Sequence, residues 1–246
     1  MLKSRSLIPH VIAIIVQTPH SVVKSFTCAM RICVETNSAT ALVILEDEND
    51  IDSILQAVKA RRHLISLCPL YFLIILCEDI SKRNEGWREH LDLSLVQSEK
   101  HIGMSDFEAS ALDGTNQEIQ PATPFEKVIY GLHILNTSLI WLSCTTNFEL
   151  SALKFAQSMI LLFEEARIEC KKPQLSRMAR ELLLQQIRYL ESAAEMRQHQ
   201  RNGLQQRAET QIGIVSGLPR GLTWQGLTSV ISSCIARFLR ETTFST

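Results

Sequence analysis

The residues best suited to chemistry lie in one short acidic run over residues 46–50. Mg²⁺ is usually bound through one or two carboxylates and several retained water molecules, so Glu46, Asp47, Glu48 and Asp50 are the candidate metal ligands. The same run precedes a predicted helix, whose positive N-terminal end is stabilised by acidic side chains. Both interpretations stay open, and Mg²⁺ is the one cofactor that the sequence suggests.

Sequence patterns of known catalytic sites are absent. The chain has no GxGxxG or GxxxxGK[ST] phosphate loop, no HExxH zinc motif and no GxSxG nucleophile motif. Its seven cysteines are odd in number and scattered, and they form no CxxC pair, which indicates free thiols in a reducing compartment. We therefore expect a cytoplasmic protein that is not an enzyme.

The charge balance argues against a nucleic-acid surface. Lys and Arg number 25 and Asp and Glu 26, which gives a formal net charge of −1. Binding to nucleic acid requires a clustered excess of Lys and Arg that displaces counterions from the phosphates. We therefore expect no nucleic acid among the partners of this protein.

The N-terminal part predicts a small sheet. Residues 11–16 form a continuous apolar run rich in β-branched side chains, which is typical of a buried strand. Residues 26–34 and 39–45 are extended runs joined by turn-forming residues, which is typical of a hairpin. An amphipathic helix over residues 46–62 is predicted to follow, with basic residues toward its end.

The rest of the chain predicts long helices. Apolar residues recur at helical spacing over residues 70–100 and 124–170, with a break in the second helix considered near residues 145–147. Trp87, Tyr130 and Trp141 share this spacing and are expected in the core. The fold class is therefore α+β and predominantly helical, with a small N-terminal β-hairpin or sheet and its helices, then long antiparallel helices and a stalk-like helix.

Four segments follow from this pattern. Residues 1–102 form the α/β N-terminal part, and residues 103–123, rich in Gly, Asp and Pro, form a linker. Residues 124–215 form the long helical hairpin and stalk, and residues 216–246 an atypical tail.

The last predicted helix has heptad spacing, which is typical of a coiled-coil seam. Apolar residues become scarce after Ala194, so we expect residues 195–211 to be solvated or to pair with another chain rather than to pack in a monomer core. The stalk is thus expected to bind a second copy or another helical partner. The candidate interface residues are Leu183, Ile187, Leu190, Arg197, Arg201 and Leu204.

No continuous apolar run reaches the roughly 20 residues that cross the hydrocarbon core of a membrane. The longest run, residues 64–77, contains Ser66 and Pro69. We expect no membrane span in this chain.

Several short blocks occur in a familiar order along residues 26–215. They are Cys68-Pro69-Leu70, Trp87 with His90-Leu91-Asp92, Leu132-His133-Ile134-Leu135-Asn136, Leu139-Ile140-Trp141-Leu142, Ile187-Arg188-Tyr189-Leu190-Glu191, and a Gln- and Arg-rich stretch that ends at Gln211. This succession resembles the cytoplasmic portion of fungal CorA-like proteins, the magnesium transporter type. The resemblance implies an α/β domain, then helices, then a long stalk helix that in the family leads into two transmembrane helices of a pentamer.

The chain departs from that family at the transport signature. The family's Gly-Met-Asn motif is absent, and Gly103-Met104-Ser105 lies in the predicted linker with no membrane helix before it. A Gly- and Pro-containing tail stands where the pore helices should begin. The resemblance therefore implies a truncated member that cannot transport ions alone, and our hypothesis is a shifted reading frame or a misplaced splice boundary near Val215.

Two functions are compatible with these observations. The first is the cytoplasmic domain of a CorA-like divalent-cation (magnesium) transporter, whose full-length relatives would be membrane proteins. The alternative is a non-enzymatic helical protein that binds other proteins through a coiled coil. A pentamer would favour the first function and a dimer the second.

Overall fold

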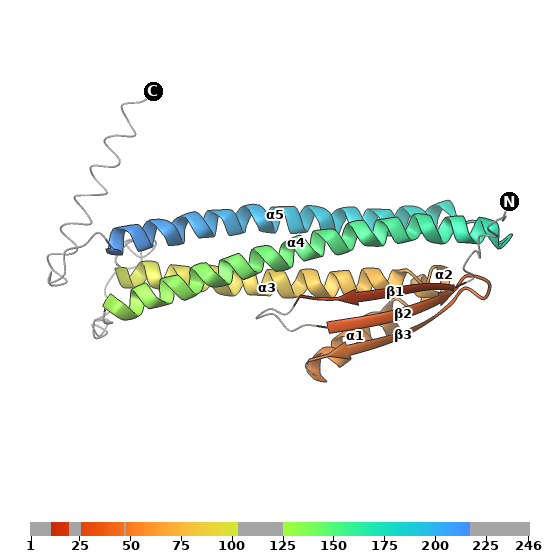
Figure 1. The fold of residues 1–246 in the computed structure, drawn as a ribbon, viewed down its shortest axis with the longest axis horizontal. Coiled ribbons are helices and arrows are strands. Elements are labelled where there is room, and N and C mark those ends of the chain that lie inside the picture. The colour runs from red at the N-terminus through yellow and green to blue at the C-terminus, as the bar shows by residue number, and fades with distance from the viewer. Residues whose placement is uncertain (1–10, 20–25, 47, 103–124, 217–246) are drawn as a thin grey trace, which may run out of the picture. The chain divides into compact units, whose positions relative to one another are not determined.

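The computed structural model describes residues 11–19, 26–46, 48–102 and 125–216, with three strands followed by helices (Figure 1). The predicted fold class, α+β and predominantly helical, is confirmed. The predicted linker and, apart from Ser216, the predicted tail lie outside the described residues. The elements in chain order are β1 (Val11–Gln17), β2 (Phe26–Cys33), β3 (Ser38–Leu45), α1 (Glu48–Ala60), α2 (Arg62–Leu67), α3 (Tyr71–Ile102), α4 (Phe125–Glu169) and α5 (Arg177–Ser216).

The chain divides into two compact units, and each of them draws on the three long helices. Unit 1 comprises Met1–His90 and Ser138–Asn202, and unit 2 comprises Leu91–Thr137 and Gly203–Thr246. Unit 1 therefore holds the sheet, α1, α2 and one part each of α3, α4 and α5. Unit 2 holds the remaining parts of the same three helices.

The sheet of unit 1 is antiparallel in the order β1-β2-β3, and its β2-β3 pair is the hairpin that the sequence predicts. Ile14 lies opposite Met30, and Met30 lies opposite Ala41. The turn between β2 and β3 places Asn37 at a φ of 53°, a left-handed conformation that Asn adopts more readily than most residues. The Asn37 side chain donates to the Ser66 carbonyl oxygen at 3.1 Å and accepts from Arg167 of α4 at 3.0 Å, so this turn is held by two other segments of unit 1.

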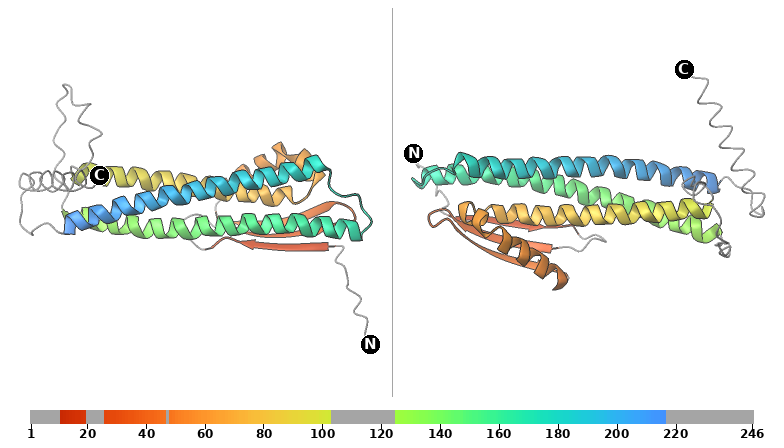
Figure 2. Two further views of the ribbon diagram at one scale, coloured as in Figure 1. Left: turned by 90° about the horizontal axis from the view of Figure 1, so that it is seen from above. Right: turned by 180° about the vertical axis from the view of Figure 1, so that it is seen from behind.

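One face of the sheet forms the core of unit 1. Side chains alternate along β1 and β2, so that Ile14, Met30 and Ile32 are buried while Ile15 is 75 % exposed. The buried face packs with Ile54 of α1 and with residues of α3, α4 and α5 in a single apolar cluster. Figure 2 shows the strands and long helices from two further directions. At about 25 cal/mol per Å² of apolar surface removed from water, this cluster is the main stabilising feature of unit 1.

Helix α4 is continuous through Thr145, Thr146 and Asn147, so the break considered there does not occur. The hydroxyls of Thr145 and Thr146 donate to the Leu142 carbonyl oxygen at 3.0 and 2.8 Å. These bonds satisfy both buried hydroxyls within the helix, which lets two residues of low helix propensity remain in it.

Helix α4, over Lys127–Glu169, is also the one helix of the described residues long and apolar enough to cross a membrane by length and composition. Residues 128–148 contain no Asp, Glu, Lys or Arg. The most apolar window has a mean hydropathy of 1.3, and 28 % of it is buried. A core helix of a soluble protein meets the same criteria, so the absence of a membrane span stays a prediction.

The polar half of α5 packs against other helices of the same chain. The prediction that residues 195–211 would not pack in a monomer core was therefore wrong. Arg197 is buried in unit 1, and Leu204, Ala208 and Gln211 are buried in unit 2. Gln211 donates to Glu99 of α3 at 2.8 Å, and Arg207 binds the same carboxylate at 2.7 Å. Polar partners on α3 therefore replace the apolar contacts that the sequence lacks here.

None of the three aromatic residues expected in the core belongs to it. Tyr130 is 69 % exposed and Trp141 is 42 % exposed, while Trp87 is half-buried. The buried stripe of α4 instead consists of Leu132, Leu135, Leu139 and Leu142. Apolar residues surround this part of α4 on all sides, so the spacing alone does not identify its inner face.

Candidate functional site

The four predicted metal ligands lie where β3 passes into α1. Glu46 is exposed between the two elements, and Glu48 and Asp50 are the first and third residues of α1. Asp47 and the side chains of Glu48 and Asp50 lie outside the described residues. Among the described residues, no group of three or more His, Cys, Asp or Glu side chains could hold a metal ion. The acidic run therefore stays a predicted metal site.

The six predicted interface residues lie on one face of α5, and this face is turned into the chain itself. Five are buried, with Leu183 and Ile187 at 1 % exposure, and Arg201 is half-buried and donates to the Leu139 carbonyl oxygen at 3.2 Å. Leu183, Ile187 and Leu190 belong to the core cluster of unit 1. An interface between chains through these residues stays a prediction, and it would require the helices to separate.

A different stripe of α5 is apolar and exposed. Met178, Leu182, Tyr189 and Met196 follow one another at spacings of four and seven residues and are 73, 39, 67 and 62 % exposed. Such spacing places them on one side of a helix. The heptad analysis selected the buried seam and missed this stripe, although its residues repeat with the same period.

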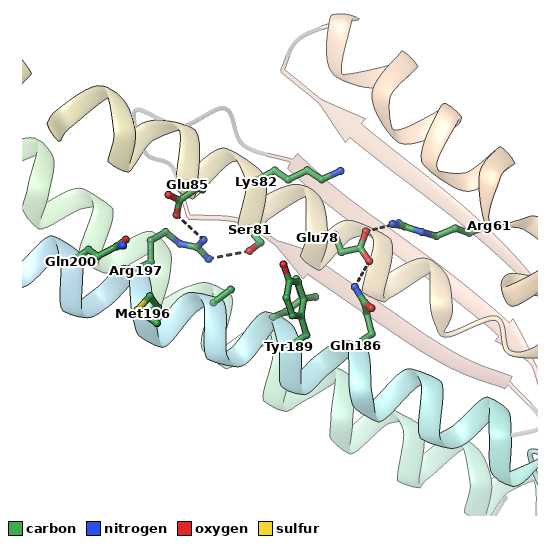
Figure 3. A pocket seen from close by; sticks show the side chains of 12 residues that line it. Arg61, Glu78, Ser81, Lys82, Glu85, Gln186, Tyr189, Met196, Arg197 and Gln200 are labelled. Atoms are coloured by element: carbon green, nitrogen blue, oxygen red, sulfur yellow. Dashed lines mark hydrogen bonds and ion pairs between the residues drawn. The ribbon is translucent and has the colours of Figure 1, made fainter. Parts of the chain in front are cut away.

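An open groove of about 510 Å³ runs between α3 and α5 in unit 1, beside this stripe (Figure 3). Its α5 wall includes the largely apolar side chains of Tyr189, Leu190, Ala193 and Met196. The α3 wall is polar, because Glu78, Ser81, Lys82 and Glu85 follow at helical spacing. The α5 side also carries Gln186, Arg197 and Gln200, so the groove has one charged side and one side on which apolar and polar residues mix.

Glu78 lies at one end of the groove and is 6 % exposed. One carboxylate oxygen accepts a hydrogen bond from Gln186 of α5 at 2.7 Å, and the other pairs with Arg61, which precedes α2. Figure 3 shows these two side chains reaching Glu78 from different elements. Since both oxygens are occupied, Glu78 joins α3 to α5 and to the start of α2.

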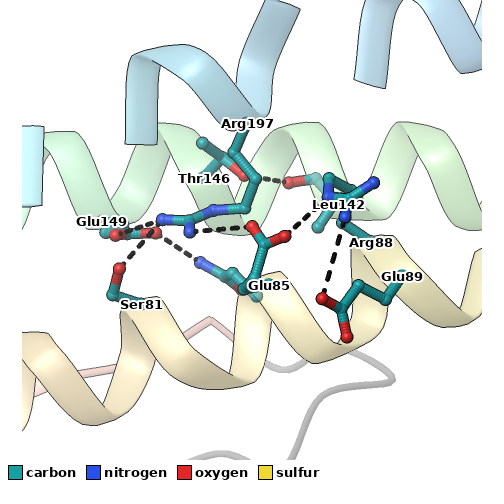
Figure 4. A network of polar contacts seen from close by, with 9 residues as sticks. Ser81, Glu85, Arg88, Glu89, Leu142, Thr146, Glu149 and Arg197 are labelled. Atoms are coloured by element: carbon teal, nitrogen blue, oxygen red, sulfur yellow. Dashed lines mark hydrogen bonds and ion pairs between the residues drawn. The ribbon is translucent and has the colours of Figure 1, made fainter. Parts of the chain in front are cut away.

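Arg197 occupies the other end of the groove within a buried polar layer (Figure 4). Its guanidinium donates to Glu149 of α4 at 2.7 Å and to Ser81 at 3.0 Å, and it pairs with Glu85 at 3.4 Å. The second Glu149 oxygen accepts from Asn84 at 2.8 Å. One layer thus connects three helices through an arginine that is 3 % exposed.

One atom of this layer has no partner in the structure. The Nε–H of Arg197 is buried and makes no hydrogen bond, whereas both terminal nitrogens of the guanidinium do. An unsatisfied buried donor costs about 1–3 kcal/mol. The polar layer therefore fixes how the helices pack, and its unsatisfied donor lowers the stability of the fold. Buried ion pairs often combine these two effects.

Burial also affects a thiol near this layer. Desolvation, together with smaller effects of the neighbouring charges of Glu149 and Glu78, raises the pKa of Cys77 on α3 to about 12. Burial likewise raises the pKa of Cys28 and Cys68 to about 11. These thiols remain protonated at neutral pH and are unsuited to act as nucleophiles, which require the thiolate.

The arrangement is suited to holding helices in register and to contacting a partner. The buried carboxylates of Glu78 and Glu149 each accept hydrogen bonds on both oxygens, so they serve as fixed counter-ions. The exposed part is the groove, with Tyr189 and Met196 of the stripe on its α5 wall, and the stripe continues beyond the groove at Met178 and Leu182.

Comparison of the chain with known protein families, with curated proteins and with solved structures finds no match.

Proposed function

We propose that this chain is a non-enzymatic cytoplasmic assembly domain of the CorA-like, magnesium transporter type. The observation that carries the proposal is the order of its elements, an antiparallel sheet with a helix followed by three long helices. That order is the one the sequence resemblance implies. In this proposal the domain responds to Mg²⁺ and associates with further copies through its helices.

The contacts of α5 support a specific assembly face. The heptad residues are occupied inside the chain, whereas Met178, Leu182, Tyr189 and Met196 are exposed. When a second helix covers such a row, each Å² of apolar surface removed from water stabilises the complex by about 25 cal/mol. We therefore assign the assembly contact to this stripe and the adjoining groove, while the buried seam holds the protomer together.

Thermal unfolding with and without Mg²⁺ tests the metal response. A ligand that binds only the folded state stabilises it in proportion to the logarithm of its concentration, so millimolar Mg²⁺ is expected to raise Tm by on the order of a few degrees. Sodium chloride at equal ionic strength is the control for screening. The matched variant carries Glu46→Gln, Asp47→Asn, Glu48→Gln and Asp50→Asn, and it is expected to lose the response. A wild-type Tm that Mg²⁺ does not change contradicts the proposal.

A helical interaction protein unrelated to transport is the second candidate, and the groove between α3 and α5 favours it. A groove with a partly apolar wall and a charged wall fits an amphipathic helix, which lays its apolar side into such a site. Here the stripe of α5 binds a different protein and Mg²⁺ has no effect on stability. The same unfolding experiment therefore separates the two candidates.

A further inference from the structure

The sheet of unit 1 ends in a strand whose outer edge is bare among the described residues. In the order β1-β2-β3, β3 has β2 as its one strand neighbour in the part of the chain that the structure describes. Every second residue of an antiparallel edge strand directs its N–H and C=O groups away from its neighbour. β3 thus presents a row of backbone donors and acceptors that only another extended strand matches in spacing.

β3 lacks the features that usually protect such an edge. Its sequence, Ser38-Ala39-Thr40-Ala41-Leu42-Val43-Ile44-Leu45, contains no charged residue, no proline and no glycine. Edge strands of monomeric proteins are normally short, charged, bulged or covered. An eight-residue, uncharged edge is typical of a strand that pairs with another strand.

β3 is also accessible from both sides over most of its length. Every residue from Ser38 to Leu42 is exposed, including Ala39 and Ala41, which share a face with the buried residues of β2. In β1, by contrast, Ile12, Ile14 and Val16 are buried. An incoming strand can therefore lie beside β3 without displacing a described side chain.

We propose that β3 pairs with β3 of a second copy of this chain in antiparallel orientation, which joins two sheets into one of six strands. A two-fold axis perpendicular to the sheet generates this pairing and keeps the open faces of both copies on the same side. In the register centred on Leu42, Leu42 lies opposite itself and Thr40 lies opposite Ile44 of the second copy. Ser38 then lies opposite Glu46.

Two observations select a second copy as the partner. A two-fold axis pairs β3 with an identical strand, so like charges near the axis would repel each other, and β3 is uncharged. The antiparallel order also keeps the Glu46 side chains of the two copies at opposite ends of the paired strands.

The open face supplies the second observation. Ile15, Ala29 and Leu42 form one cross-strand row, with Ile15 75 % and Leu42 63 % exposed. The two-fold axis places this row end to end with its copy and produces a continuous apolar row across six strands. A partner strand with polar side chains on this face would end the apolar row of Ile15, Ala29 and Leu42 at β3.

Analytical ultracentrifugation of the full chain tests the pairing. Without added Mg²⁺, the wild type is expected to sediment with twice the mass of one chain. Leu42→Lys places two like charges opposite each other and is expected to yield a monomer. Ile15→Lys adds the same charge to the same face but on β1, and it is expected to remain dimeric. A wild-type monomer, or a dimer that Leu42→Lys does not dissociate, overturns the proposal.

Disulfide trapping provides a second test that does not depend on a disruptive charge. Directly opposed residues of an antiparallel pair have Cα atoms about 4.5–5.5 Å apart, within the range that a disulfide spans. Leu42→Cys, in a chain whose exposed Cys144 is replaced by serine, is expected to form a covalent dimer on mild oxidation. Ile15→Cys in the same background is the control. Equal crosslinking of both variants, or crosslinking of neither, overturns the proposal.

The proposed β3 pairing and the proposed Mg²⁺ response can be contradicted independently of each other. β3 pairing is independent of metal, so its loss in Leu42→Lys leaves the Mg²⁺ response unchanged. A lost Mg²⁺ response in turn leaves the mass of the β3 dimer unchanged.

Discussion

Arg197 of α5 and Glu149 of α4 form an ion pair with an Nη2–Oε1 distance of 2.7 Å, and their side chains are 3 % and 0 % exposed. Such a pair stabilises little compared with an apolar pair of the same shape, because both charges lose their hydration. Removal of one partner leaves the other as an uncompensated charge in the core. The pair therefore fixes how α3, α4 and α5 pack in unit 1.

Replacement of Arg197 by methionine is expected to destabilise the fold by about 3–5 kcal/mol, because Glu149 then stays buried without its counter-ion. The double variant Arg197→Met with Glu149→Leu is expected to recover much of that loss. Urea unfolding followed by circular dichroism measures both. The exposed pair of Arg177 and Glu181, also on α5, is the control, and Arg177→Met is expected to cost at most about 0.5 kcal/mol. Equal stability of Arg197→Met and Arg177→Met would contradict the role of the buried layer.

The buried seam of α5 is expected to act on stability rather than on assembly. Ile187 is 1 % exposed in the core of unit 1, so Ile187→Ala is expected to cost about 2–5 kcal/mol. Ile168 on α4 is 53 % exposed, so Ile168→Ala is expected to stay within about 0.5 kcal/mol. Denaturant unfolding compares the two variants. If this seam formed the contact between chains, Ile187→Ala would instead reduce the size of the assembly and change the stability of the protomer little.

The buried thiols make stability fall at alkaline pH. A free thiol has a pKa of about 8.5, and burial raises the pKa of Cys77 to about 12 in the folded chain. Above about pH 8.5 the unfolded chain loses this proton while the folded chain keeps it, so the stabilisation present below that pH is progressively lost as pH rises toward 12. The slope is about 1.4 kcal/mol per pH unit for each such thiol.

Unfolding in the presence of reductant at pH 8 and pH 10 measures this effect. Cys77→Ala is expected to show a shallower decline of unfolding free energy than the wild type. Cys144→Ser, which changes an exposed thiol, is expected to follow the wild type. Identical pH slopes for Cys77→Ala and the wild type would contradict the assignment.

The strands and the approximate bounds of the three long helices could be predicted from the sequence because their signals are local, whereas the short α2 was not predicted. The β-branched runs and the turn before Ser38 define the strands, and α4 begins at Phe125, next to the predicted start at residue 124. Heptad spacing also identified the face of α5 that is buried. It could not indicate whether that face meets the same chain or another one.

The polar layer could not be predicted because its members are distant in sequence. Arg197 and Glu149 are separated by 48 positions, and Arg197 and Glu85 by 112. An arginine in a heptad seam is ordinarily solvated, and only the carboxylates on α3 and α4 allow Arg197 to be buried. The exposure of Tyr130 and Trp141 was missed for a related reason, since α4 has apolar residues on all sides there.

Light scattering of the full chain with and without millimolar Mg²⁺ tests the proposed assembly function most directly. Leu42→Lys serves as the background, so that β3 pairing does not contribute to the mass. We predict a Mg²⁺-dependent shift to a larger, defined oligomer that is lost when Tyr189→Glu and Met196→Glu are added on the exposed stripe of α5. A mass that Mg²⁺ does not change, or a Mg²⁺-dependent oligomer that those two substitutions leave intact, would contradict the account.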